Sequence, residues 1–276
     1  MKGIILAGGE GNRLKPLTEY TNKHLLHIYN QPMISYPLST LVDAGIKDIL
    51  IVTGPKHAGM FLQCLGDGNK FGAHLQFKVQ VKAEGIAHAL GLCRKFVGND
   101  SCAVILGDNI YEDDLNKEMK NFATSVNNGS KGAHIFLKEI ENPQRFGVAE
   151  LEGKNVKKIE EKPKNPKSNY AVTGLYLFDS QVFSIIDVLK PSNRGEYEIT
   201  DVNNEYIKRG QLTATLLKKR WTDSGTFESL FRANDIAREL FLKKNFGSAR
   251  AQESIRSKKS AESEFITKEQ LSSLES

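Results

Sequence analysis

Short apolar runs alternate with amphipathic stretches along the first half of the chain. Residues 2–6, 48–53 and 101–106 are continuous apolar segments and predict buried strands, while residues 74–80 alternate as a half-exposed strand does. Residues 32–44 and 84–96 carry apolar positions at helical spacing, and the first of these has Pro32 at its start and Gly45 just past its end. Strands that alternate with helices predict an open, mostly parallel α/β sheet with helices on both faces.

The pattern is more mixed after residue 130. Further strands are expected at residues 133–138, 148–151, 156–160, 173–178 and 212–217, and helices at residues 181–189, 199–208 and 227–242. From residue 247 the chain becomes rich in serine and charge, and disorder is expected there, although Thr267 and Gln270 would cap a short helix. The sequence thus predicts one domain over residues 1–246 and a polar, serine-rich C-terminal tail over residues 247–276.

The bulk composition narrows the class of protein. The chain has 276 residues, of which 39% are hydrophobic and 26% charged, as in ordinary globular proteins. The net charge of +5 is too mild and too evenly spread to indicate nucleic acid, and no apolar run approaches the ~18 residues of a membrane span. The three cysteines, Cys64, Cys93 and Cys102, form no C-x-x-C pair, and the first residues do not resemble a signal peptide. We therefore expect a cytoplasmic protein with reduced thiols and no nucleic-acid or membrane partner.

A glycine-rich turn with nearby cations follows the first strand. Gly8, Gly9 and Gly11 precede Arg13 and Lys23, and this combination is typical of a backbone that approaches an anion closely. The turn lacks the G-x-x-x-x-G-K-[ST] pattern of a Walker A loop. It also lacks the third glycine of a dinucleotide fingerprint, so a nicotinamide-dependent enzyme is only weakly supported. A phosphate cradle and an ordinary turn remain equally open on this loop alone.

Two aspartates occupy positions suited to a metal ion. Asp108 directly follows a buried strand and therefore lies at the carboxyl edge of the sheet, where open α/β proteins bind ligands. Asp223 follows a late strand and precedes a helix. Two carboxylates beside a polyphosphate suit Mg²⁺, although each aspartate is also a common turn or helix cap.

Another pair of charged residues, Glu161 and Lys162, ends a predicted strand. The Lys162 ammonium is a compact charge suited to a phosphate, and the Glu161 carboxylate can accept hydrogen bonds from sugar hydroxyls. A solvated charged turn is the alternative for this run.

Taken together, these segments resemble a known enzyme family. The motifs ILAGGEGNRLKPLT, NKHLL, LGDNI, RFGVAE, EEKPKNPKSNYAVTGLY, RGEYEITDVN and WTDSGT occur in order over about residues 2–235. They resemble the sugar-1-phosphate nucleotidyltransferases, and most closely the glucose-1-phosphate thymidylyltransferases. The resemblance implies a three-layer α/β/α sandwich with a mostly parallel, mixed central sheet, the Rossmann-like nucleotidyltransferase fold, and a homo-oligomer, by analogy a tetramer.

The same resemblance implies an activity. Enzymes of this kind transfer a nucleotidyl group from dTTP to glucose 1-phosphate in the presence of Mg²⁺, by in-line attack on the α-phosphorus, and release pyrophosphate. The same reaction with UTP or with another sugar 1-phosphate remains open, as does an inactive sugar-nucleotide sensor on the same fold.

The resemblance also assigns roles to residues. Its catalytic set is Arg13, Lys23, Asp108, Lys162 and Asp223, with Arg13 and Lys23 facing the leaving pyrophosphate and Asp108 and Asp223 holding Mg²⁺. The residues that it places around the nucleotide are Leu6, Ala7, Gly8, Gly9, Gly11, Gln80 and Gly85, the last two reading the base. The residues that it places around the sugar and its phosphate are Asn109, Gly147, Glu161, Lys162, Val172 and Arg194.

Four positions and the tail depart from the family pattern. Asn12 replaces a threonine or serine, His24 a glutamine, His27 a proline and Phe146 a tyrosine. The spacing of His24 and His27 favours ordinary packing, or a hydrogen bond at the edge of a phosphate, over a metal pair. Phe146 lacks the hydroxyl that would contact the sugar. Because the tail also differs from the C-terminus of the family, the resemblance does not carry over a regulatory product site.

Overall fold

The computed structural model describes residues 1–245, and within that part of the chain a nine-stranded sheet forms the centre. Along its main path the strand order is β10-β9-β11-β6-β1-β4-β5, and β8 lies between β11 and β12. The strand bounds are β1 Lys2–Ala7, β4 Asp48–Thr53, β5 His74–Val79, β6 Cys102–Leu106, β8 Ala133–Glu139, β9 Gly147–Glu152, β10 Asn155–Glu161, β11 Tyr170–Phe178 and β12 Leu212–Leu216.

The sheet is mixed, and its parallel part carries the predicted ligand edge. Strands β6, β1, β4 and β5 run parallel in one continuous register, in which Leu6 of β1 pairs with both Leu106 of β6 and Val52 of β4. Strand β11 runs antiparallel to β6, β8 and β9, and β12 runs parallel to β8. Because β1, β4 and β6 share a direction and a register, the loops that follow them meet at one edge.

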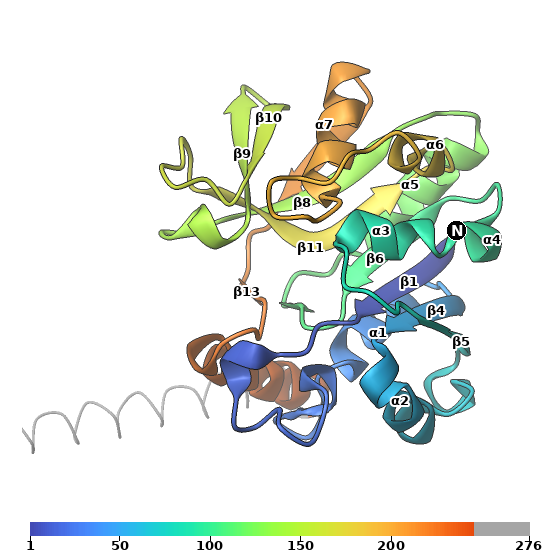
Figure 1. Ribbon diagram of the computed structural model, residues 1–276, viewed down its shortest axis with the longest axis vertical. Coiled ribbons are helices and arrows are strands. Elements are labelled where there is room, and N and C mark those ends of the chain that lie inside the picture. The colour runs from blue at the N-terminus through green and yellow to red at the C-terminus, as the bar shows by residue number, and fades with distance from the viewer. Residues whose placement is uncertain (246–276) are drawn as a thin grey trace, which may run out of the picture.

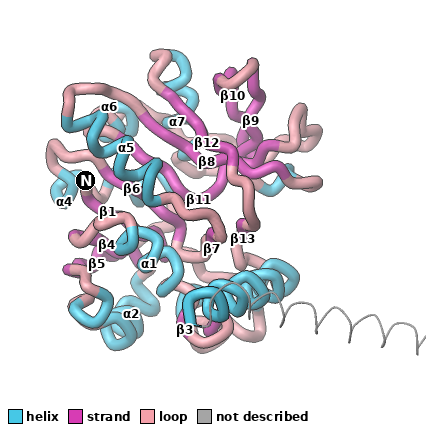
Figure 2. The backbone as a smooth tube through the Cα atoms, turned by 180° about the vertical axis from the view of Figure 1, so that it is seen from behind, coloured by secondary structure: helices cyan, strands magenta, loops and turns pink. Residues whose placement is uncertain are grey.

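Helices cover both faces of this sheet, as the alternation of strands and helices predicts (Figures 1 and 2). Ile4 and Leu6 pack into the core under α3 and α6, whereas Ile5 and Ala7 pack into the core under α1 and α2. The helix bounds are α1 Ser35–Asp43, α2 Ala58–Leu65, α3 Ile86–Gly91, α4 Arg94–Val97, α5 Asn116–Asn127, α6 Val182–Ile186 and α7 Ile199–Lys208. A three-layer α/β/α sandwich of Rossmann-like type results.

A third apolar cluster lies beside the sandwich. A helix over residues 227–245 packs Ala233, Ile236 and Ala237 against Ile28 and Met33. Two short two-stranded pairs support this corner, namely β7 Ile110–Tyr111 with β13 Trp221–Thr222, and β2 His27–Ile28 with β3 Gln31–Pro32. Among the described residues no helix is long and apolar enough to cross a membrane. The predicted tail, residues 247–276, lies outside the described part of the chain.

Two helices begin later in the structure than the sequence predicts. The helix expected over residues 32–44 begins only at Ser35, because Gln31 and Pro32 pair with β2 as strand β3. The helix expected over residues 84–96 begins at Ile86 and divides into α3 and α4. Its start is displaced because Gly85 has a φ of 102° and its backbone lies against Tyr197, where a Cβ would come within 2.5 Å of the Tyr197 carbonyl oxygen.

A candidate active site at the carboxyl edge of the parallel strands

The ends of β1 and β6 are held in contact at the ligand edge. The Gly107 amide donates to the Leu6 carbonyl over 2.9 Å, which extends the strand pairing into the loop that carries Asp108. A Cβ on Gly107 would come within 2.8 Å of the His24 ring and 3.2 Å of the Ala7 side chain. Only glycine therefore allows the loop after β6 to lie against the loop after β1.

The glycine-rich turn after β1 wraps around Lys23. A Cβ on Gly9 would lie 3.2 Å from Cε of Lys23, and a Cβ on Gly11 would lie 2.8 Å from its Cβ. Gly11 has a φ of 71°, and its carbonyl accepts a hydrogen bond of 2.8 Å from the Thr18 hydroxyl. The predicted glycine loop thus exists, and it fixes the direction of the Lys23 side chain.

Lys23 and Asp108 form an ion pair at the centre of this edge. Nζ of Lys23 lies 2.5 Å from Oδ2 of Asp108, and the two side chains are only 14% and 13% exposed. Burial by itself would raise the pKa of Asp108, but the Lys23 ammonium holds that pKa below its usual value. Asp108 therefore stays ionised and available to a cation.

His24 lies beneath this ion pair and is not placed as a metal ligand. Its Nδ1 lies 2.6 Å from Oδ1 of Asn22, which accepts only, so Nδ1 carries the proton. Burial lowers the pKa of His24 to about 3, so the ring is neutral at physiological pH. His27 is exposed in β2. The two histidines therefore have different environments, and packing accounts for His24.

Asn109 ties the site to the rest of the sheet. Its Oδ1 accepts hydrogen bonds from the Trp221 indole over 2.7 Å and from the Gly174 amide over 3.0 Å, and its Nδ2 donates to Oδ1 of Asp108 over 2.9 Å. Because this buried amide is engaged on both sides, it fixes the orientation of Asp108. The resemblance predicts Asn109 at the sugar phosphate, and the structure adds this scaffold role.

Asp223 is the second predicted metal ligand, and two arginines surround it. Its Oδ2 accepts a hydrogen bond of 2.9 Å from Nη2 of Arg145. A Cβ on Gly225 would lie 3.2 Å from the same oxygen and 2.9 Å from Nη2 of Arg13. The next residue, Ser224, has a φ of 38°, which is a strained conformation for a residue other than glycine.

The predicted sugar side is organised around Glu161. Its two oxygens accept hydrogen bonds from the Thr200 hydroxyl over 2.6 Å and from Arg194 over 3.2 Å. Arg194 also pairs with Glu196 at 2.8 Å and lies 3.6 Å from Glu198. These contacts fix Glu161 at the cavity wall with its hydrogen-bonding positions already ordered.

Lys162 follows Glu161 in a constrained conformation. Its φ is 43°, in the left-handed region, and its amide donates to the Phe146 carbonyl over 3.0 Å. Its Nζ lies 3.5 Å from Oε1 of Glu161. Backbone strain of this kind clusters at ligand-binding positions, and here it directs the lysine into the cavity.

Two separate cavities are lined by predicted residues. The first has a volume of about 280 Å³ and is lined by Gly8 and Gln80 among the predicted nucleotide residues. The second, of about 210 Å³, is lined by most of the catalytic and sugar residues, namely Arg13, Asp108, Asn109, Gly147, Glu161, Lys162, Val172 and Asp223.

The remaining predicted residues, Lys23 among them, are not in the lining of either cavity but adjoin it. Leu6 and Ala7 end strand β1, Gly9 and Gly11 contact Lys23, and Gly85 accepts a hydrogen bond from Gln80 over 3.4 Å. Arg194 pairs with Glu196 and Glu198, both of which line the second cavity. The structure thus brings the predicted residues from distant segments to one edge.

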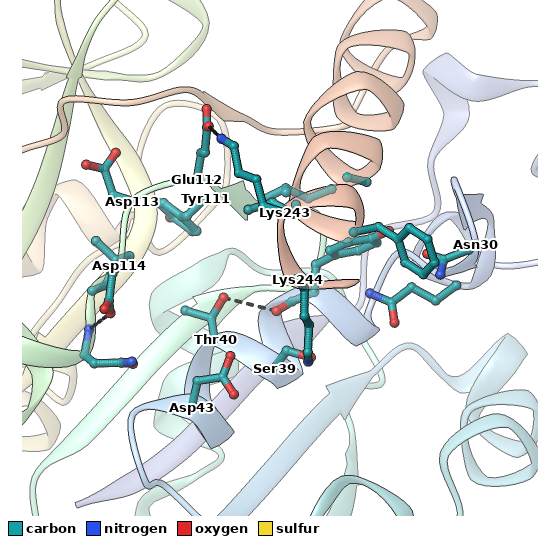
Figure 3. Close-up of a pocket in the computed structure, with 18 of the residues that line it drawn as sticks. Asn30, Ser39, Thr40, Asp43, Tyr111, Glu112, Asp113, Asp114, Lys243 and Lys244 are labelled. Atoms are coloured by element: carbon teal, nitrogen blue, oxygen red, sulfur yellow. Dashed lines mark hydrogen bonds and ion pairs between the residues drawn. The ribbon is translucent and has the colours of Figure 1, made fainter. Parts of the chain in front are cut away.

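A larger cavity lies elsewhere and contains none of the predicted residues. Its volume is about 930 Å³, and it lies between α1 and the end of the helix over residues 227–245 (Figure 3). Thr40 and Asp43 approach it from α1, while Lys243 and Lys244 approach it from the C-terminal helix. Cavity size alone would therefore have pointed away from the predicted residues at the sheet edge.

Several residues of the site were not singled out from the sequence. Arg145 pairs with Asp223, Trp221 anchors Asn109, and Thr200 donates to Glu161. Arg145 stands in the motif RFGVAE directly before Phe146, so its charge next to a family motif was a usable signal. Thr200 stands in the motif RGEYEITDVN, but its contact with Glu161 was not apparent because the two residues lie 39 positions apart in the chain.

Comparison with known proteins places this site in a wider group. The family model described as nucleotidyl transferase matches residues 2–239. Among curated proteins, the glucose-1-phosphate thymidylyltransferase of Mycolicibacterium smegmatis is 47% identical over 248 residues, which cover 88% of this chain and 84% of that protein. The enzyme of the same name from Neisseria meningitidis is 45% identical over 237 residues, covering 84% and 81% of the two chains.

Solved structures agree with these sequence relatives. A Bacillus anthracis protein assigned as a glucose-1-phosphate thymidylyltransferase, crystallised in complex with sucrose, superposes with a TM-score of 0.81 at 53% identity. The match covers 86% of this chain and 95% of that one. A UDP-glucose pyrophosphorylase in complex with UDP-glucose superposes with a TM-score of 0.75 at 26% identity, covering 86% of this chain and 98% of that one.

Proposed function

Because the chain belongs to the nucleotidyl transferase family, we propose that it transfers the thymidylyl group of dTTP to glucose 1-phosphate and releases pyrophosphate. The observation that carries the proposal is the placement of Lys23–Asp108 and Arg145–Asp223, two ion pairs, beside one cavity that also contains Lys162. The site therefore has cationic side chains for two separate phosphate groups, and two carboxylates lie among them. Two polyanionic substrates need such an arrangement before they can react.

The reaction forms one phosphorus–oxygen bond and breaks another. A phosphate oxygen of the sugar 1-phosphate attacks the α-phosphorus of dTTP, and the bond to the β-phosphate breaks as pyrophosphate leaves. Little proton transfer is needed, because the attacking oxygen is already an anion. Catalysis therefore depends on position and on electrostatic stabilisation.

The cations have two separate tasks in this scheme, one at the pyrophosphate and one at the sugar phosphate. Arg13 and Lys23, which lie beside the glycine loop, neutralise the charge that accumulates on the departing pyrophosphate. Lys162 holds the phosphate of the sugar, and the Glu161 carboxylate accepts hydrogen bonds from sugar hydroxyls. Thr200 and Arg194 keep Glu161 oriented for that purpose.

Mg²⁺ is the cofactor that we propose, with Asp108 and Asp223 as its protein ligands. The donor set fits a hard cation, because both groups are carboxylates beside the same cavity. No cluster of three or more His, Cys, Asp or Glu side chains suitable for a metal occurs within residues 1–245. A site with two carboxylates leaves coordination positions for phosphate oxygens and water, as Mg²⁺ prefers. When bound, the ion would neutralise charge at the reacting phosphate.

The test of this function is a matrix of substrates. Pyrophosphate release is measured with dTTP, UTP and dCTP, each against glucose 1-phosphate, galactose 1-phosphate and mannose 1-phosphate, in Mg²⁺ and then with excess chelator. We expect dTTP with glucose 1-phosphate to give the highest kcat/KM, and the chelator to abolish release. Absence of release with every pair would refute the enzymatic proposal and favour a sugar-nucleotide sensor.

UTP is the second candidate substrate. The structural likeness to a UDP-glucose pyrophosphorylase favours it, and thymine differs from uracil by only one methyl group, which discriminates by about 10–200-fold at most. A higher kcat/KM for UTP than for dTTP in the same matrix would select this candidate.

We also propose a cytoplasmic location and a homo-oligomeric state. Cys93 and Cys102 are unpaired and buried, and burial raises the pKa of Cys93 to about 12, so these thiols are inert packing groups that a reducing compartment preserves. The oligomer, by family analogy a tetramer, rests on the resemblance alone, and light scattering of the purified full chain tests it.

A further inference from the structure

Gln80, which the resemblance places at the nucleobase, is held by a chain of hydrogen bonds from α3. Its Nε2 lies 3.0 Å from Nδ1 of His88 and 3.4 Å from the carbonyl oxygen of Gly85. Nε2 of His88 in turn lies 3.3 Å from Oε2 of Glu84. Three side chains are thus connected in the order Glu84, His88, Gln80, and the last one reaches the nucleotide cavity.

The proton positions in this series of hydrogen bonds follow from the groups at its two ends. A carboxylate oxygen of Glu84 accepts, so we assign the ring proton of His88 to Nε2, which donates to it. Nδ1 then has a lone pair and accepts from the Gln80 amide. The carbonyl of Gly85 is likewise only an acceptor, so both neighbours require the NH₂ group of Gln80 to face α3. The orientation of the amide is therefore determined by its environment.

The other end of the Gln80 amide faces the glycine loop. A Cβ on Gly8 would lie 3.2 Å from Oε1 of Gln80, and Gly8 and Gln80 line the same cavity of about 280 Å³. Because the residue is 9% exposed, this oxygen is largely removed from bulk water. A ligand in the cavity meets a hydrogen-bond acceptor at this position.

The backbone around α3 holds the chain of side chains in place. The Tyr197 amide donates to the Glu84 carbonyl over 2.8 Å, and the Ala87 amide donates to the Tyr197 carbonyl over 3.1 Å. The His88 and Tyr197 rings lie 6.2 Å apart. These backbone hydrogen bonds to Tyr197 hold the segment that carries Glu84 and His88.

We propose that His88 is a positioning residue that fixes the Gln80 amide, so that Gln80 presents its carbonyl oxygen and selects bases with a ring N–H. Thymine and uracil offer a donor at N3, whereas cytosine offers an acceptor at N3. An acceptor opposite the Gln80 oxygen leaves both groups unpaired, and a buried unpaired group is costly. The inference rests on the proposed function for the role of Gln80, and it adds the residue that determines its orientation.

The experiment compares His88→Leu and His88→Asn with the unaltered chain. Binding of dTTP, UTP and dCTP without sugar phosphate is measured by calorimetry, and kcat/KM for each nucleotide is measured with glucose 1-phosphate. Leucine removes the acceptor at Nδ1 and leaves the longer contact with the Gly85 carbonyl as the remaining partner that orients the Gln80 amide. Asparagine retains an acceptor oxygen, Oδ1, near the position of Nδ1. Thermal unfolding of both variants confirms that α3 is intact.

We expect His88→Leu to lower the preference for dTTP over dCTP about tenfold, and to lower the preference for UTP over dCTP equally. The His88→Asn variant should keep both ratios within about twofold of the unaltered chain. A residue that only packs would reduce the affinity for every nucleotide by a similar factor and leave the ratios unchanged.

Two results would overturn the inference: unchanged ratios in His88→Leu, or no preference for dTTP over dCTP in the unaltered chain. Failure of the proposed function gives a different result, because the calorimetric ratios do not depend on turnover. If the protein binds dTTP selectively but releases no pyrophosphate, the proposed function is contradicted. The binding ratios of the His88 variants still test the role of His88.

Discussion

Nζ of Lys23 lies 2.5 Å from Oδ2 of Asp108, although 85 positions separate the two residues in the chain. The contact joins the glycine loop after β1 to the loop after β6, and both side chains are largely buried. In the proposed reaction the two groups have different partners, since Lys23 faces the pyrophosphate and Asp108 faces Mg²⁺. In the free protein each therefore neutralises the other until the substrates arrive.

The first prediction concerns Asp108→Asn. Removal of this carboxylate eliminates one proposed metal ligand, and we expect kcat to fall by about 10²–10³-fold. Mn²⁺ binding, measured by electron paramagnetic resonance, should weaken in parallel. The free energy of unfolding should fall by less than the ~3–5 kcal/mol of a fully buried pair, because the Lys23 side chain keeps 14% exposure.

A matched control for this variant is Asp114→Asn, which removes one negative charge outside the site. Asp114 caps the amide of Asn116 over 3.0 Å, and asparagine can accept the same hydrogen bond. Turnover of this control should equal that of the unaltered chain. Full activity of Asp108→Asn in Mg²⁺ would refute the metal assignment.

The second prediction concerns Lys162→Ala. Loss of one positioned charge at the sugar phosphate should reduce kcat/KM for glucose 1-phosphate by about 10²–10³-fold, while dTTP binding without the sugar stays unchanged. Lys164 is exposed two residues further along, so Lys164→Ala controls for loss of charge on this turn. If both variants behave alike in steady-state kinetics, Lys162 is only part of a solvated turn.

Most of the sheet could be predicted from the sequence, and the reason is burial. The strand over residues 48–53 is predicted without error as β4, because all of its apolar side chains are covered by helices on two faces. The helix over residues 199–208 is likewise found at both ends as α7. In such segments the hydrophobic pattern is dictated by the same contacts that hold the fold together.

The sequence patterns did not predict helices α2 and α5, for two different reasons. Helix α5 buries only Met119 completely, so its sequence NKEMKNFATSVN has too narrow an apolar face to mark a helix. Helix α2, with the sequence AGMFLQCL, begins without a side-chain cap and contains Gly59. In both segments the contacts with the sheet decide the conformation, and the local pattern does not show them.

Some residues of the candidate site could likewise be predicted from the sequence, and others could not. Residues inside long motifs, such as Gly11 and Asp108, were found because each motif places them after a strand. The ion pair between Arg145 and Asp223 was not found, because it joins segments 78 positions apart. A sequence without related chains beside it contains no signal for such pairing.

The third prediction concerns pH and Glu112, which lies outside the proposed active site. Burial would raise its pKa, but hydrogen bonds from Arg220 and Lys243 lower the pKa from 4.5 to about 2. Since the folded value lies below the unfolded one, this group stabilises the fold above about pH 4.5. That contribution is lost as the pH falls towards 2.

Urea denaturation of the unaltered chain and of Glu112→Gln at pH 6 and pH 3 tests this expectation. The difference in unfolding free energy between the two proteins should be larger at pH 6 than at pH 3. An equal difference at both values would mean that the carboxylate contributes no ionic stabilisation in the folded state.

The fourth prediction concerns Arg145, whose guanidinium donates to Oδ2 of Asp223 over 2.9 Å. A cation that already occupies a proposed metal ligand competes with the metal, so Arg145→Ala should bind Mn²⁺ about 2–5-fold more tightly without nucleotide, as expected for loss of one partly exposed ion pair. Turnover should nevertheless fall, because Asp223 then has no fixed orientation opposite Arg13.

The variant Arg145→Lys keeps the charge but not the planar fork, and its Mn²⁺ affinity should remain near that of the unaltered chain. Electron paramagnetic resonance titration gives both affinities, and weaker Mn²⁺ binding in Arg145→Ala would mean that the arginine orients Asp223 for the metal instead of competing with it.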